Sequence, residues 1–129
     1  MNKLTIILLA AIVVMSSCKK GPGQGGTATI KGNVHTTDYN STLLIIQGEY
    51  PSADQDVYII YGNDITYGDR AKSGPDGNYE FKYLREGDYK IYVYSDDTTL
   101  SGKIAVYTNV EITKKKQTVF ADTLQIKKN

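Results

Sequence analysis

Residues 74–94 read GPDGNYEFKYLREGDYKIYVY, which predicts a turn, a strand, a tight corner and a longer strand. Asp76-Gly77 lies between two alternating segments. A hairpin turn is expected there, because Gly accepts a positive φ without a Cβ clash. Tyr79 and Phe81 then alternate with charged residues, which indicates a strand with one buried face and one wet face.

The second half of this stretch predicts a reversal followed by another strand. Leu84 closes the first strand, Gly87 permits the chain to turn back, and Tyr89 opens the next strand. A Tyr in that place can bury its ring and return its hydroxyl to a nearby backbone group, as in the tyrosine corner of Greek-key sandwiches. The new strand alternates between one face with Tyr89, Ile91 and Val93 and another with Lys90, Tyr92 and Tyr94.

These residues form the pattern Asp-Gly-x-Tyr-x-Phe-x-x-Leu-x-x-Gly-x-Tyr-x-Ile-x-Val, from Asp76 to Val93. The pattern resembles the carboxypeptidase regulatory-like domains, which are prealbumin-like β-sandwiches common in bacterial envelope proteins. The match is densest over residues 74–94 and extends more loosely from Ala28 to about Ile126. The resemblance implies a fold and no catalytic residues, because such modules share none.

The rest of the chain adds further strands and no convincing helical period after Cys18. A run of four apolar residues within Thr42–Gln47 fits a buried strand or a short helix, and its β-branched residues and strand-rich surroundings favour the strand. The other strands are expected at Thr27–His35, Val57–Tyr61, Gly102–Thr113 and Gln117–Ile126, with a bulge allowed in the last. Residues 27–129 are therefore predicted to form one all-β domain, a prealbumin-like or Ig-like Greek-key sandwich of about seven strands.

The N-terminus predicts export and lipidation. Residues 1–17 combine an early Lys3 with an apolar run, Leu4–Val14, that is shorter than the about 20 residues of a membrane span. Small residues then precede Cys18, the only Cys, and resemble the lipobox of bacterial lipoproteins, with Met15 a departure from the usual aliphatic residue. We expect a lipoprotein signal peptide over 1–17, lipidation of Cys18 and an outer-membrane anchor. With Lys19-Lys20 after the Cys, the sequence leaves undecided whether the protein faces the cell surface or the periplasm.

Residues 18–26 hold the expected lipidated Cys and a Gly-rich flexible tether. Removal of residues 1–17 from the 129 would leave 14 basic and 14 acidic residues. Balanced charge argues against a nucleic-acid partner, and no free Cys would remain for a thiolate site.

The polar residues do not assemble into a known catalytic or metal-binding motif. His35 is the only His, and Asp64, Asp69 and Asp76 do not have the spacing of a calcium loop. Adjacent Asp96 and Asp97 point to opposite faces of an extended chain. The sequence contains neither a nucleophile elbow nor a phosphate-binding glycine loop. We therefore expect a non-enzyme without metal or other cofactor.

Tyrosine is the enriched residue type, with 11 Tyr against 2 Phe and no Trp. Tyr58, Tyr92 and Tyr94 are predicted on the outer face of neighbouring strands, where they would serve as a ligand-binding face or merely cover the sheet. The first functional hypothesis is an envelope interaction or scaffold module for a protein partner. The alternative is a surface lipoprotein that binds polysaccharide through this Tyr face.

Overall fold

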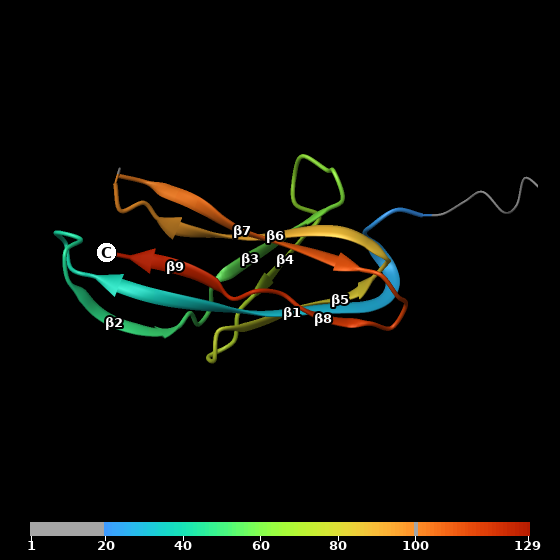
Figure 1. Ribbon diagram of the computed structural model, residues 1–129, viewed down its shortest axis with the longest axis horizontal. Helices are drawn as coiled ribbons and strands as arrows, with labels where there is room; N and C mark the ends of the chain where they lie inside the picture. The colour runs from blue at the N-terminus through green and yellow to red at the C-terminus, as the bar shows by residue number, and fades with distance from the viewer. Residues whose placement is uncertain (1–19, 100) are drawn as a thin grey trace, which may run out of the picture.

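The structure is a computed structural model that describes residues 20–99 and 101–129. These residues form two β-sheets packed face to face (Figure 1), which confirms the predicted all-β sandwich. Cys18 and the expected signal peptide lie outside them. Within the described ranges no helix is long and apolar enough to cross a membrane. The strands are β1 (Gln24–Tyr39), β2 (Ile46–Pro51), β3 (Asp56–Tyr61), β4 (Asp69–Lys72), β5 (Asn78–Leu84), β6 (Gly87–Asp96), β7 (Lys103–Ile112), β8 (Thr118–Phe120) and β9 (Leu124–Lys128).

The first sheet is built around β1, a strand of 16 residues. Its first half pairs antiparallel with β5 on one edge and parallel with β8 on the other. Its second half pairs with β2 and β9 in the same manner. The strand predicted over Gln117–Ile126 is thus divided into β8 and β9, which accounts in part for nine strands where about seven were expected.

The second sheet has the order β4-β3-β6-β7, and all its pairs are antiparallel. One face of each sheet supplies the core, because side chains alternate along a strand. The stretch that begins at Gly74 supplies the core residues expected from its period: Tyr79, Phe81, Tyr89, Ile91 and Val93. Leu84 is also buried, but the alternation breaks at Tyr83, which has a φ of 59° and an exposed side chain. The other sheet strands contribute Ala28, Ile30, Val34, Val57, Ile59, Val110, Ile112, Leu124 and Ile126.

The tyrosine corner is confirmed at Tyr89. Its hydroxyl donates to the carbonyl of Arg85 at 2.6 Å and accepts the N–H of Gly23 at 2.9 Å. The ring itself is buried. One phenol therefore connects the β5–β6 corner to the segment that precedes β1.

The boundary predicted for the flexible tether is wrong. Gln24–Gly26, assigned to the tether, already belong to β1, and Gly23 is buried. The side chain of Arg85 donates to the carbonyls of Gly21, at 2.7 Å, and Gln24. The glycines of this segment permit close approach to the corner, whereas their abundance in the sequence suggested flexibility.

The buried strand predicted at Thr42–Gln47 is also wrong. Residues 40–45 form the turn between β1 and β2, where the Leu44 side chain is 84% exposed. Asn40 Oδ1 accepts the N–H groups of Leu44 and Ile45, at 3.1 and 3.2 Å. The turn chemistry of Asn prevails here over the apolar character of the run.

We predict that the domain loses stability at alkaline pH. Burial raises the pKa of Tyr79, Tyr89 and Tyr92 above the ordinary value of 10.0. Above pH 10 the unfolded chain releases protons that the folded chain keeps. The free energy of unfolding is therefore highest below pH 10 and falls as the pH rises above it. Tyr79 alone would contribute a slope of up to about 1.4 kcal/mol per pH unit. Urea denaturation at a series of pH values measures this slope, and a Tyr79→Phe variant with an unchanged slope would contradict it.

Candidate tyrosine-lined binding surface

The outer face of the second sheet carries one continuous row of large side chains. Tyr58 on β3 lies opposite Arg70 on β4 and opposite Tyr92 on β6. Tyr92 lies in turn opposite Tyr107 on β7. Directly opposed residues share a face of the sheet, so the strand register places all four side chains side by side.

Five aromatic rings meet on this face, and we call them the tyrosine surface: Tyr58, Tyr67, Tyr92, Tyr94 and Tyr107. The rings of Tyr58 and Tyr92 stack at 5.0 Å with an interplanar angle of 15°. Tyr94 meets each of these two rings edge-on at 5.7 Å. Tyr107 extends the surface to β7, at 5.9 Å from Tyr92. Offset and edge-to-face contacts of this kind stabilise aromatic clusters, so the rings support one another.

The loop between β3 and β4 forms one side of this surface. It rises above the outer face of the sheet in Figure 1, drawn in green. Tyr67 from this loop contacts Tyr58 at 4.9 Å. Ile65 beside it is 97% exposed. The arrangement is therefore a flat aromatic floor with a projecting, partly apolar loop at its border.

The structure brings together the three tyrosines that the sequence predicted, but only two of them are accessible as expected. Tyr58 is partly exposed and Tyr94 is exposed, as expected for a binding face. Tyr92 is only 9% exposed, because rings from both neighbouring strands and from its own strand cover it. Burial, followed by the nearby Tyr94, raises the pKa of Tyr92. Tyr92 thus supports the surface and offers little contact area of its own.

Sequence reasoning missed Tyr67 and Tyr107. Tyr107 is 58% exposed and lies on the polar side of the alternation in β7, a signal the sequence does contain. Its position opposite Tyr92 depends on the β6–β7 register. Tyr67 follows a turn, and only the path of the loop places it beside Tyr58.

Exposed cations border the tyrosine surface. Lys90 Nζ lies 5.4 Å from the centroid of the Tyr107 ring. Arg70 is exposed at the opposite end of the row. Lys72 ion-pairs with Asp54 and Asp56, in each case at 3.6 Å. Hydrogen-bond donors thus stand on both sides of the rings.

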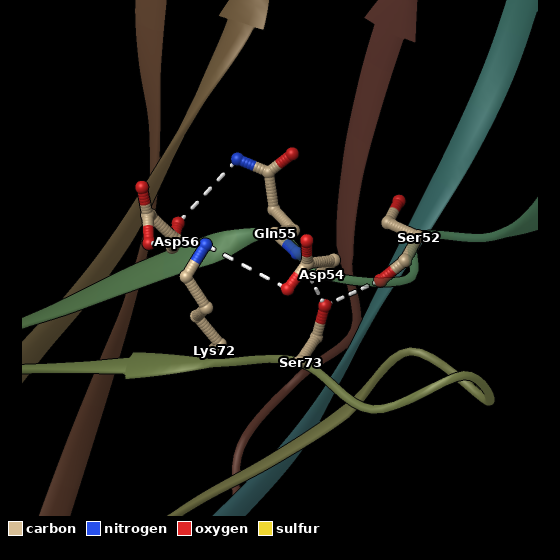
Figure 2. A network of polar contacts seen from close by, with 6 residues as sticks. All are labelled: Ser52, Asp54, Gln55, Asp56, Lys72 and Ser73. Carbon is tan, nitrogen blue, oxygen red and sulfur yellow. Dashed lines mark hydrogen bonds and ion pairs between the residues drawn. The ribbon is translucent and has the colours of Figure 1, made fainter.

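A polar network holds the β2–β3 loop beside this border (Figure 2). Ser73 Oγ accepts the N–H of Gln55 at 2.9 Å and donates to the carbonyl of Ser52. The backbones of Gln55 and Ser73 also pair, at 2.9 Å. Lys72 extends from the neighbouring position toward the two carboxylates. The network fixes the end of β4 to the loop and so orients the Lys72 side chain.

A separate hollow of about 740 Å³ lies on the first sheet, lined in part by Lys31, Asn33, Asn78 and Phe120. Its two asparagine side chains already have hydrogen-bond partners within the chain. Asn33 Nδ2 donates to Asn78 Oδ1 at 2.8 Å, and Asn78 Nδ2 donates to Asp76 at 2.7 Å. The tyrosine surface offers more exposed aromatic area, and we regard it as the stronger candidate.

The remaining polar candidates stay apart. His35 Nδ1 lies 3.2 Å from Gln125 Oε1. Asp97 Oδ1 accepts the N–H and the hydroxyl of Thr99, whereas Asp96 binds Lys103. No three His, Cys, Asp or Glu side chains of residues 20–99 and 101–129 gather as a metal site would require.

No family model and no curated protein matches this chain. A solved structure from Pseudomonas aeruginosa, to which carbohydrate binding is ascribed provisionally, is similar over 78% of this chain and 90% of its own. The identity is 13% and the TM-score is 0.48. A likeness at that distance carries no argument about function, which has to come from the geometry of the tyrosine surface.

Proposed function

We propose that this chain is a non-catalytic envelope protein that binds polysaccharide through the tyrosine surface. The observation that carries the proposal is the tyrosine surface itself, which spans three strands. Tyr94 and Tyr107 are exposed on it, and cations stand at its borders. Aromatic rings pack against the C–H groups on the face of a sugar ring. Tyr is suited to this role because it joins an apolar ring to a polar hydroxyl.

The shape of the surface favours an extended chain of sugars. A small-molecule site is usually a concave pocket that covers most of its ligand. The tyrosine surface is instead the open face of a sheet, with a projecting loop along one side. Arg70 and Lys90 stand at its borders, and neither forms an ion pair within the described part of the chain. Two cations without an ion pair among the described residues favour a polysaccharide that carries carboxylates.

The cellular setting is part of the same proposal. The lipobox-like residues before Cys18 support cleavage after residue 17, lipidation of Cys18 and attachment to the outer membrane. The pattern from Asp76 to Val93 supports a carboxypeptidase regulatory-like module, a type without shared catalytic residues. A binding module held at the envelope would retain polysaccharide close to the membrane.

Binding to soluble polysaccharides tests the proposal. We expect Tyr94→Ala and Tyr107→Ala each to weaken binding about tenfold, which corresponds to about 1.4 kcal/mol. Tyr94→Phe keeps the ring and is expected to retain most of the affinity. Affinity electrophoresis with one neutral and one uronate-containing polysaccharide measures both effects.

Tyr50→Ala is the matched control, because Tyr50 lies on β2 in the other sheet and is also exposed. It should bind as the unaltered chain does. Equal binding by all variants, or no binding to either polysaccharide, would refute the proposal.

A second candidate is the interaction module for a protein partner. The exposed aliphatic tip of the β1–β2 hairpin favours it, because Leu44, Ile45 and Ile46 are all more than half exposed. Exposed apolar side chains in a cluster are typical of protein contact sites. If polysaccharide binding fails, partner capture that depends on Leu44 and Ile45 would support this candidate instead.

A further inference from the structure

We propose that β7 is the contact edge for a second copy of this chain, so that the four-stranded sheets of two molecules join into one. This inference concerns a different feature from polysaccharide binding and does not depend on it. β7 has ten residues and ends the sheet order β4-β3-β6-β7, and β6 is its only strand partner among residues 20–99 and 101–129. The β6–β7 pairing shows no register shift from Lys103 to Ile112, so the free edge is regular.

The free edge lacks the usual devices that prevent strand addition. Natural edge strands are commonly short, interrupted by Pro or a bulge, or charged in their middle. The middle of β7, Ala105–Asn109, contains no charge and no Pro. Its two charged residues, Lys103 and Glu111, stand near opposite ends.

The backbone groups that face this edge can be identified. Asp88 O accepts the N–H of Gly62, so the even-numbered residues of β6 direct their backbone groups toward β3. The odd-numbered residues of β6 therefore face β7 and bond its even-numbered residues, such as Thr108 opposite Ile91. The N–H and C=O groups of Ala105, Tyr107 and Asn109 consequently point outward, available to another strand.

The sequence of β7 is complementary to itself in one antiparallel register. With Tyr107 opposite Tyr107 of the second copy, Lys103, which also forms an ion pair with Asp96 of its own chain, faces Glu111 of that copy, and the reverse pair forms by symmetry. On the core side Ile104, which is 47% exposed in the single chain, would face Val110 of the second copy. Opposite charges and apolar pairs at facing positions both stabilise an antiparallel ladder.

The two neighbouring registers lose this match. If the two copies were centred on Thr108, Glu111 would face Ala105 and Lys103 would face Thr113. If they were centred on Val106, Glu111 would face Ser101 and Lys103 would face Asn109. The complementarity is therefore specific to the register centred on Tyr107. In that register the tyrosine rows of the two molecules meet at Tyr107 and form one surface across both copies.

Cysteine pairing in membranes of producing cells tests the contact with the full chain. Two differently tagged chains are produced together, one with Ala105→Cys and the other with Asn109→Cys. These positions face each other in the proposed register with Cα atoms about 5.5 Å apart, within disulfide range. We expect a disulfide-linked pair that contains both tags. Neither variant should pair with itself, because the two copies of one position are about 13 Å apart.

Charge reversal distinguishes this register from chance collision. Glu111→Lys in the Asn109→Cys chain should lower the linked fraction about fivefold, because an attractive pair becomes repulsive. Lys103→Glu in the Ala105→Cys chain should then restore it, since the two reversed charges meet across the contact. Asp96→Asn is added to that chain, because Asp96 binds Lys103 and would otherwise repel the new Glu. Absence of the linked pair, equal self-pairing of the single variants, or no rescue by Lys103→Glu would each overturn the proposal. The unaltered chain controls for any disulfide through Cys18.

Discussion

Gly26→Ala is expected to lower the free energy of unfolding by about 3 kcal/mol, although Gly26 lies in a segment whose composition suggests a flexible tether. A Cβ at this position would lie 2.0 Å from the carbonyl oxygen of Leu84 and 2.5 Å from the backbone N of Arg85. Both atoms belong to the backbone at the end of β5 and the start of the corner. They cannot move aside as a flexible side chain can, so the start of β1 would have to separate from β5.

Thermal and urea denaturation measure this effect, and the melting temperature should fall by more than about 8 °C. Gly21→Ala is the matched control, because a Cβ there meets no described residue within 4 Å. A true tether predicts that both substitutions are neutral. Equal stability of the two variants would show that residues 24–26 do not pair with β5 as described.

Tyr89→Phe and Tyr79→Phe are expected to change stability in opposite directions, although both remove one hydroxyl from a buried ring. The Tyr89 hydroxyl binds the carbonyl of Arg85 and the N–H of Gly23, so its loss leaves two backbone groups without their partner. A cost of about 1–3 kcal/mol is expected. The corner and the segment before β1 would loosen together.

The Tyr79 hydroxyl is buried and has no hydrogen-bond partner within the part of the chain that the structure describes. Burial of an unpaired hydroxyl is unfavourable, so its removal should be neutral or stabilise the domain by up to about 1 kcal/mol. Urea denaturation at pH 7 compares the two variants directly. A clear loss of stability in Tyr79→Phe would mean that its hydroxyl has a partner, and an unchanged Tyr89→Phe would mean that the corner bond contributes nothing.

The region from Gly74 to Tyr94 was predictable because its structure is determined locally. A Gly-permitted turn, a period-two strand, a reversal at Gly87 and the placement of Tyr89 depend on neighbours in the sequence. The structure shows β5, β6 and the bond from Tyr89 to Arg85 where these signals predict them. The same alternation placed Tyr58, Tyr92 and Tyr94 on an outer face.

Sequence reasoning was wrong for two segments because their composition is compatible with two different structures. Glycines before β1 indicate flexibility in isolation, but here they permit a strand to approach Leu84 closely. The apolar run at Leu43–Ile46 indicates burial, but Asn40 binds its backbone N–H groups and turns it into an exposed hairpin tip. In both cases a contact outside the run decides its structure.

The sequence by itself determined the fold class, the core face of the central strands and the outward direction of the predicted tyrosines, because alternation along a strand is a local property. Only the tertiary structure decided which tyrosines meet. The register of β3, β6 and β7 aligned Tyr58, Tyr92 and Tyr107, buried Tyr92 among them, and the loop path added Tyr67. The register is set by hydrogen bonds and packing between strands that are far apart in the chain. The pattern within one strand therefore does not reveal which residue of which strand will lie opposite.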